Sequence, residues 1–375
     1  MINPPPEASP ISWLTDLDQA ARLASGEHGN ETTSVLGAVE QALVEDDRPE
    51  ILARSDRAIE LLARDKRWRI GMQLAHHLYA VVQTWSEFDA SAYAKTLAQF
   101  TFNYALEFKQ AHVLGPAEDL LRQALHLFEE GAEPRGAVAC EHQLGCVLQE
   151  RGELWRAQQA YFSSLQRARR LNDARLVCRN LFQLGQLAQL KGDLAASVDW
   201  YSQTLALAEE MSDERVATAR CHQLGMIEQM RGHYLAATDR FHDAFARAEK
   251  MNDARGAAIA LHQLGMLAQA QGELSRADEL YRASLTFAAQ LPDPAEQAPT
   301  LYQLAQCAWI RGEFATARDY GYRSLGLVQA QGNLEGIDRV RRLLSSIPSR
   351  SLAGGGATSI LATGGDKISP SRSPS

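Results

Sequence analysis

The segment His142-Gln143-Leu144-Gly145 returns along this chain of 375 residues at a constant spacing of 40 residues. The later copies are Phe182-Gln183-Leu184-Gly185, His222-Gln223-Leu224-Gly225, His262-Gln263-Leu264-Gly265 and Tyr302-Gln303-Leu304-Ala305. A glycine stands seven residues after the last residue of each copy, at Gly152, Gly192, Gly232, Gly272 and Gly312. Self-similarity at a fixed period of this length indicates an array of stacked structural repeats.

Each unit of the array is predicted to contain two helices. In the first clear unit they cover about 134–150 and 153–171, with Gly152 between them and Asn172-Asp173 at the end. The second helix carries a small residue, then an aromatic residue four positions on, as in Ala157 and Tyr161. The fifth unit departs from this pattern, with Gly321 in the aromatic position. One such hairpin cannot bury its apolar face, so neighbouring units must stack.

The order of small residue, turn glycine, alanine and aromatic residue resembles the tetratricopeptide repeat (TPR) family. The 40-residue form is similar to the repeats of kinesin light chain and of bacterial TPR regulators. The resemblance covers about 134–333 as five units, although the family's usual aromatic residue late in the first helix is absent. It implies an all-α fold, a right-handed superhelical solenoid of stacked antiparallel helix pairs. The first helix of each pair would line the concave groove.

The segments outside the array are expected to differ from it. We expect an acidic helical cap at 1–64, with helices at about 13–24, 33–44 and 50–64, and degenerate helical repeats at 65–133. A capping helix is expected at 334–348, and a disordered tail at 349–375, where glycine, serine and proline gather.

Composition narrows the classes of function. The net charge is −8, and residues 1–60 hold twelve acidic and four basic residues, which disfavours a nucleic-acid partner or a helix-turn-helix DNA reader there. No apolar run is long enough to span a membrane and no secretory signal is visible, so we expect a cytoplasmic protein. Five cysteines without metal-binding spacing indicate reduced thiols. Known catalytic, phosphate-binding and metal-binding motifs are absent, so we expect neither an enzyme nor a cofactor or metal.

The predicted groove contains two rows of candidate partner-binding residues. The first is a row of glutamines, whose amides can both donate to and accept from the backbone of an extended peptide: Gln143, Gln183, Gln223, Gln263 and Gln303. The second row consists of the residues that precede the glutamines: His142, Phe182, His222, His262 and Tyr302. Trp309, late in the first helix of the fifth unit, is added to this row. The alternative is that these side chains only pack between helices or bond to each other.

These observations favour a non-enzymatic scaffold or adaptor that binds a partner protein or extended peptide in the groove. The alternative is a regulatory sensor whose curvature is switched by a peptide or by its own tail. An RNA-binding helical repeat is a third possibility, but it would require basic residues in a groove where the glutamine row is neutral. The sequence leaves the partner and the oligomeric state open.

Overall fold

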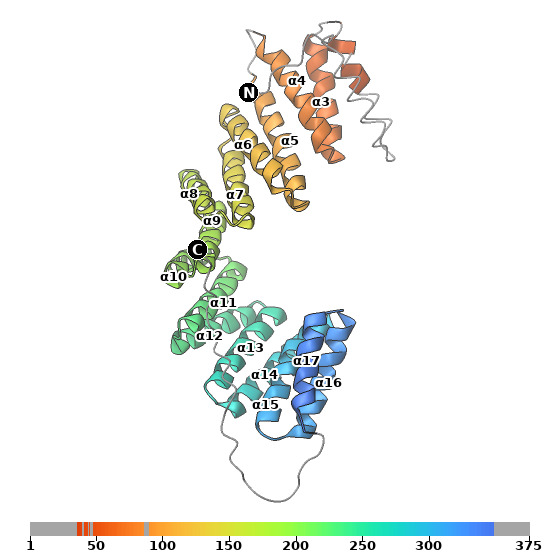
Figure 1. Cartoon of the computed structure of the whole chain (residues 1–375). Helices are drawn as coiled ribbons and strands as arrows, with labels where there is room; N and C mark the ends of the chain where they lie inside the picture. Colours follow the sequence, from red (N-terminus) through yellow and green to blue (C-terminus); the bar gives the residue numbers. More distant parts are fainter. Residues whose placement is uncertain (1–35, 40, 44, 46–47, 86–89, 349–375) are drawn as a thin grey trace, which may run out of the picture. The chain divides into compact units, whose positions relative to one another are not determined.

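All regular structure in the described part of the chain is helical. The computed structural model describes residues 36–39, 41–43, 45, 48–85 and 90–348, and no strand occurs among them (Figure 1). The helices are α3 (Arg48–Arg64), α4 (Trp68–Gln83), α5 (Ser91–Gln110), α6 (Leu114–Glu130), α7 (Pro134–Glu150), α8 (Leu154–Arg170), α9 (Ala174–Leu190), α10 (Leu194–Glu210), α11 (Glu214–Met230), α12 (Tyr234–Lys250), α13 (Ala254–Ala270), α14 (Leu274–Ala288), the short 3₁₀ helix η1 (Pro294–Gln297), α15 (Ala298–Ile310), α16 (Phe314–Ala330) and α17 (Leu334–Ser346). The all-α prediction is confirmed.

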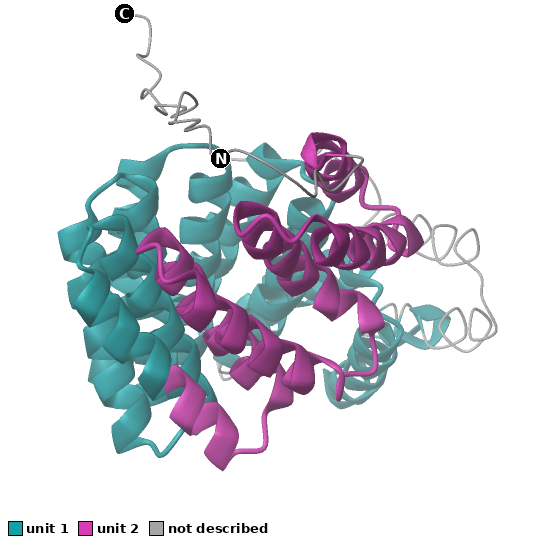
Figure 2. Ribbon diagram, turned by 90° about the horizontal axis from the view of Figure 1, so that it is seen from below, with its two compact units in different colours: residues 1–243 teal, residues 244–375 magenta. Residues whose placement is uncertain are grey.

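The chain divides into two compact units, residues 1–243 and 244–375, and the division falls within the sequence of α12 (Figure 2). In each unit, helices pack mainly against their neighbours in sequence, as a solenoid of antiparallel pairs requires. We call α7, α9, α11, α13 and α15 the A helices, and the helices that follow each of them the B helices. The helices expected before residue 36 and the tail from 349 lie outside the described residues, and the expected segment boundaries remain a prediction.

The backbone reverses through a left-handed residue almost every 20 residues. From residue 112 on, positive φ angles occur at Gly152, Gly192, Gly232, Gly272, Gly312 and Gly332, and also at the non-glycine residues His112, Ala132, Asn172, Ser212 and Asn252, while Lys66 has a positive φ outside this series. The series omits residue 292 because this position is a proline, whose ring fixes φ near −65°. The chain instead enters α15 through η1. The regular turns extend back to His112, one unit before the clear sequence repeat.

A contact between a small residue and an aromatic ring sets the spacing inside each helix pair. A Cβ atom placed on Gly145, Gly185, Gly225 or Gly265 would lie only 2.4–2.6 Å from a ring carbon of Tyr161, Tyr201, Phe241 or Tyr281, respectively. These four rings are completely buried. In the fifth unit the helix A residue is Ala305, and the B helix carries Gly321, against which Leu344 of α17 packs. The missing ring therefore coincides with the one small position that has a Cβ.

Polar contacts 33 residues apart join successive pairs. Arg151 donates to Glu118, Lys191 Nζ donates to Gln158 Oε1 over 2.9 Å, and Arg311 Nη2 donates to Asp278 Oδ1 over 3.0 Å. Burial alone would raise the pKa of Asp278, but hydrogen bonds from Arg282 and Arg311 lower it below its ordinary value. These contacts link the C-terminal ends of α7, α9 and α15 to α6, α8 and α14, respectively.

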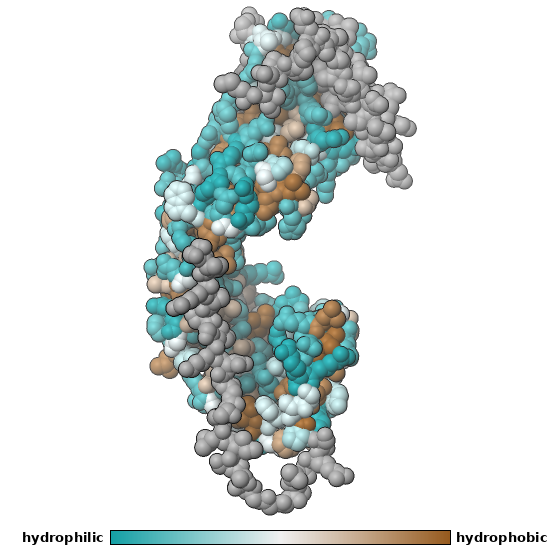
Figure 3. Space-filling view, in the orientation of Figure 1, coloured by the Kyte–Doolittle hydropathy of each residue, from teal (hydrophilic) through white to brown (hydrophobic). Residues whose placement is uncertain are grey.

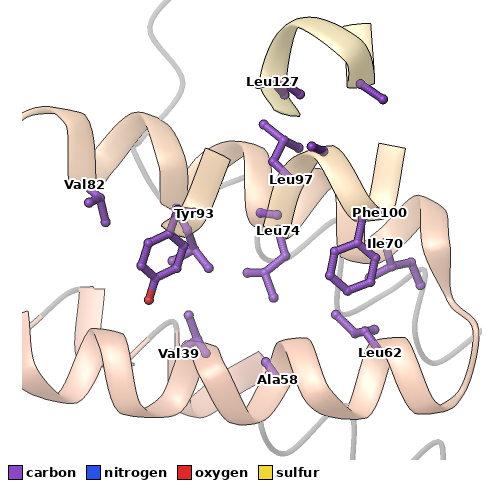
Figure 4. Packing of buried hydrophobic residues seen from close by; sticks show 14 of the residues in the cluster. Val39, Ala58, Leu62, Ile70, Leu74, Val82, Tyr93, Leu97, Phe100 and Leu127 are labelled. Carbon is purple, nitrogen blue, oxygen red and sulfur yellow. The ribbon is translucent and has the colours of Figure 1, made fainter. Parts of the chain in front are cut away.

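The N-terminal helices share one apolar core (Figure 4). Phe100 of α5 lies beside Ile70 of α4 and Leu62 of α3, and all three are buried. A Cβ on Gly71 would lie 2.1 Å from Phe100, so α4 and α5 approach each other through a small residue and an aromatic ring, as the later pairs do. The sequence predicted helices here without a clear repeat register, and the contact explains why they nevertheless stack.

Candidate functional site

The five glutamines occupy the same position on successive A helices, and all are partly exposed. Gln143 Oε1 accepts a hydrogen bond from Lys109 Nζ over 2.9 Å. Within the described part of the chain, the side-chain amides of Gln183, Gln223, Gln263 and Gln303 form no hydrogen bond. Four of the five amides therefore keep both donor and acceptor groups available for a partner.

In the first four units, the residue before the glutamine packs against the aromatic ring of its own B helix. Ring centroids are 5.7 Å apart for His142 and Tyr161, and 5.5 Å apart for His262 and Tyr281. Phe182 and His222 make the matching contacts with Tyr201 and Phe241, at 5.9 and 5.6 Å. This row therefore helps to hold each hairpin together.

Two of the histidines also bond to the next A helix. His142 Nδ1 lies 3.0 Å from Asn180 Oδ1, and His262 Nδ1 lies 3.0 Å from Thr300 Oγ1. His142 is 4% exposed, which leaves little of this side chain for a partner. Burial lowers the pKa of both histidines to about 4, so their rings are neutral near pH 7. His222 has an alanine, Ala260, at the equivalent partner position, and its Nε2 is buried without a hydrogen bond.

A cavity in the second unit brings several of the candidate residues together. It has a volume of about 500 Å³, and its lining includes His262 and Met266 from α13 and Tyr302 and Gln303 from α15. Residues of α16 and α17, among them Val328, complete the lining. A smaller cavity of about 210 Å³ is lined in part by Gln263 and His262. The larger volume falls in the range of ligand sites, which bury most of a small ligand or a peptide side chain.

The remaining aromatic candidates differ in their solvent exposure. Trp309, in the last turn of α15, is 38% exposed. Tyr302 is partly buried, and its hydroxyl accepts a hydrogen bond from Gln306 Nε2 over 3.0 Å. Phe182 is partly buried beneath a side chain that sequence reasoning did not select, Arg220, whose guanidinium carbon lies 3.9 Å from its ring centroid. Comparing the residues two positions before each row member, Asn180, Arg220, Ala260 and Thr300, would have singled out Arg220 as the charged one.

The described ranges also contain neither a metal-binding cluster nor a membrane-spanning helix. No group of three or more His, Cys, Asp or Glu side chains there could hold a metal ion. None of the helices seen there is both long and apolar enough to cross a membrane. On the face of the molecule shown in Figure 3, polar residues cover much of the surface and hydrophobic side chains form smaller patches among them.

Comparisons with known proteins identify the fold. No family model matches this chain, and no curated protein matches it in sequence. Among solved structures, a signal transduction ATPase with numerous domains and a tetratricopeptide repeat sensor, from Pyrococcus horikoshii, matches with a TM-score of 0.58 and 13% identity, over 89% of this chain and 52% of that one. The apo form of RapI matches with a TM-score of 0.54 and 14% identity, over 89% and 96%.

The C-terminal part of a TPR repeat-containing protein from Cytophaga hutchinsonii also matches, with a TM-score of 0.51 and 14% identity, over 76% of this chain and 98% of that one. This chain therefore has the helical solenoid fold of tetratricopeptide repeat proteins, as its repeated motif indicated. At these identities the likeness shows the fold alone.

Proposed function

We propose that this protein is a non-enzymatic scaffold that binds an extended segment of a partner protein along its A helices. The observation that carries the proposal is the cavity of about 500 Å³ lined by His262, Met266, Tyr302 and Gln303. His262 and Tyr302 occupy equivalent positions of α13 and α15, and both were candidates from the sequence alone, as was Gln303. The unbonded amides beside them supply the polar groups that an extended backbone requires.

In the expected binding mode, the glutamines bind the partner's backbone and the cavity binds one of its side chains. The amides of Gln263 and Gln303 would bond to the partner's backbone, while the cavity would receive one of its side chains. Each neutral hydrogen bond contributes about 0.5–1.5 kcal/mol. Because backbone bonding is independent of side chains, specificity would come from the cavity and from the residues that vary between repeats.

A selection from a displayed library of random linear peptides, using the full chain as bait, tests the proposal. Selected peptides should bind a Gln263→Ala, Gln303→Ala double variant more weakly by about 1–3 kcal/mol, which is roughly 5- to 150-fold in affinity. The matched control is Gln329→Ala on α16, an exposed glutamine outside the cavity lining, which should bind as the wild type does. If no peptide is selected, or if the double variant binds as the control does, this function is wrong.

A regulatory sensor is the second candidate, because one of the similar folds is described as a tetratricopeptide repeat sensor. It predicts that a selected peptide changes the conformation of the chain as well as binding to it. Small-angle X-ray scattering of the full chain, with and without a saturating peptide, separates the two candidates. A rigid scaffold keeps its scattering profile, whereas a sensor changes its radius of gyration.

A further inference from the structure

The helix pair α8 and α9 carries a positive charge between two negatively charged pairs. Residues 154–190 hold six arginines and one aspartate, a net charge of +5. The equivalent residues 114–150 hold seven acidic and two basic residues, a net charge of −5. Residues 194–230 hold six acidic and two basic residues, a net charge of −4. The basic pair therefore differs from both of its neighbours within the first unit.

Four of the six arginines have no partner among the described residues. Arg156 and Arg167 each bond to two glutamates. Asp173, the single acid of the stretch, pairs with Arg135 of α7, whose Nη2 lies 3.2 Å from its Oδ2. The other four arginines surround the turn between α8 and α9, and their exposed side chains form no hydrogen bond or ion pair within the described ranges; we call them the arginine cluster: Arg169, Arg170, Arg175 and Arg179.

The stability of the fold does not account for this cluster. Arg175 lies in the first turn of α9, where the helix dipole disfavours a positive charge. Arg179 follows one turn later on the same face, where the equivalent residues of the other A helices are alanine, isoleucine or proline. The last turn of α8 ends with Arg169 and Arg170, whereas α6 and α10 have glutamates at both positions. Unpaired like charges around one turn repel each other, so an anion bound there would stabilise the protein.

The arginine cluster adjoins the glutamine row. Arg179 stands four residues before Gln183, so both side chains share one face of α9. Burial is the main cause of the low pKa of His142, and the charges of Arg179 and Lys109 lower it further, so both cations lie near α7. Lys109 Nζ in turn donates a hydrogen bond to Gln143 Oε1 over 2.9 Å. Positive side chains therefore lie beside two of the candidate glutamines.

We propose that the arginine cluster binds a short acidic segment of a partner protein, with aspartate or glutamate side chains at alternate positions. Arg175 and Arg179 are about 6 Å apart along the helix axis, and alternate side chains of an extended segment lie about 7 Å apart on one side. Each guanidinium can donate two parallel N–H bonds to a carboxylate. The acidic stretches on both sides would repel a long polyanion or an anionic membrane, which favours a short segment. This surface lies in the first unit and does not use the cavity of the second unit, so it goes beyond the function proposed above.

An NMR titration of the full chain with a short peptide tests the proposal. The probe is a hexapeptide that alternates glutamate and serine, and its control has glutamine in place of glutamate. The glutamate peptide should shift the amide resonances of α8 and α9 saturably at about 0.01 M salt, with a dissociation constant on the order of 1 mM. Binding should weaken several-fold at about 0.1 M salt, where the screening length falls from about 30 to about 10 Å. Because the whole chain has a net charge of −8, non-specific attraction would not produce this result. Equal binding of the glutamine peptide, or no saturable shift, would overturn the proposal.

Neutralising two arginines separates binding from stability. Arg175→Gln combined with Arg179→Gln should weaken binding of the glutamate peptide roughly 2- to 30-fold, because each exposed ion pair contributes about 1.4- to 5-fold. Arg341→Gln combined with Arg342→Gln on α17 makes the same change in net charge at exposed positions and should bind as the wild type does. The midpoint of thermal unfolding of the first variant should stay equal or rise at low salt, since repulsion is removed. If it binds as the control variant does, or if its midpoint falls, the arginines do not form this binding surface.

Other occupants would give different results, and each would replace the proposed one. Hexathymidylate that binds more tightly than the glutamate peptide would assign the surface to a nucleic acid. A single phosphoserine in the glutamine peptide with the same effect would assign it to a phosphorylated segment. The acidic N-terminal part of this chain is tested by neutralising its carboxylates in the full chain. Shifts of the α8 and α9 resonances upon that change, without any peptide, would show that this part of the chain occupies the surface. The carboxylates to be neutralised are those of Glu7, Asp16, Asp18, Glu27 and Glu31.

Discussion

Adding one methyl group at Gly225 should separate α11 from α12. The Cβ of an alanine there would lie 2.6 Å from Cε1 and 2.8 Å from Cδ1 of Phe241, whereas carbon atoms in contact normally lie about 3.5–4.0 Å apart. The Phe241 ring is completely buried and packs against His222, so it cannot swing into solvent. Either the ring or a helix must move by about 1 Å.

The size of the effect follows from two opposing terms. Overpacking of this kind costs about 1–3 kcal/mol, and alanine is about 1 kcal/mol more favourable than glycine inside a helix. Gly326 provides the control, because it lies inside α16 and a Cβ there would meet nothing within 4 Å. Gly326→Ala should therefore stabilise the protein by about 1 kcal/mol, and Gly225→Ala should fall about 1–3 kcal/mol below that control.

Urea denaturation followed by far-UV circular dichroism measures these differences, and a double-mutant cycle assigns their cause. Phe241→Leu removes the Cε1 and Cζ atoms that approach Gly225, so it should recover part of the loss caused by Gly225→Ala. The two changes should be coupled by at least about 0.5 kcal/mol. If Gly225→Ala stabilises the protein as much as Gly326→Ala does, or if the cycle shows no coupling, the close approach does not set the helix spacing.

Three further predictions concern stability. Burial lowers the pKa of His142 and His262 from 6.5 to about 4, so stability that is complete above about pH 6.5 should fall as the pH decreases towards 4, by up to about 3 kcal/mol per histidine. Replacing both with phenylalanine should flatten the decline in urea melts at about pH 7 and about pH 5. Burial raises the pKa of Glu118, but hydrogen bonds from arginines lower it by more, so the ionised carboxylate stabilises the folded state. Glu118→Gln should therefore lower the free energy of unfolding by about 1–3 kcal/mol near pH 7. The difference between variant and wild type should shrink in acid, where the carboxylate becomes protonated. Ser212 has a positive φ of 55°, which is unfavourable for serine, so Ser212→Gly should raise the free energy of unfolding by about 1 kcal/mol at most, measured as a higher unfolding midpoint. Asn172→Gly should change it little, because asparagine tolerates this conformation.

The fold could be predicted because one sequence period carries every contact within a helix pair. Gly225 and Phe241 lie 16 residues apart and recur together, so the chain shows both partners of the contact in successive copies. Turn residues recur in the same way, and where proline prevents a positive φ at residue 292 the structure changes locally without losing the stacking. The exchange of Ala305 and Gly321 follows the same packing rule and is also visible in the sequence.

Contacts between successive A helices were harder to predict. The partner of His142 is Asn180, 38 residues away, and this offset depends on how neighbouring pairs stack rather than on the period itself. The sequence therefore left open whether the histidines face a partner or pack inside the array. The structure adds that two of them have neighbours that complete their hydrogen bonds, while four of the five glutamines beside them have none within the described ranges.

Equivalent positions of successive repeats carry chemically different side chains at the candidate site. Arg220 of α11 lies on the ring of Phe182, whereas Ala260 stands at the same position of α13. Arg220 is partly exposed, and its guanidinium group stacks on the ring of Phe182. The hydroxyl of the neighbouring Tyr201 also lacks the glutamine partner that Tyr161 and Tyr281 have. The two irregularities lie close together, since the Arg220 guanidinium carbon is 5.8 Å from the Tyr201 ring centroid, so the side-chain chemistry of the array varies locally while the close approach inside each helix pair stays the same.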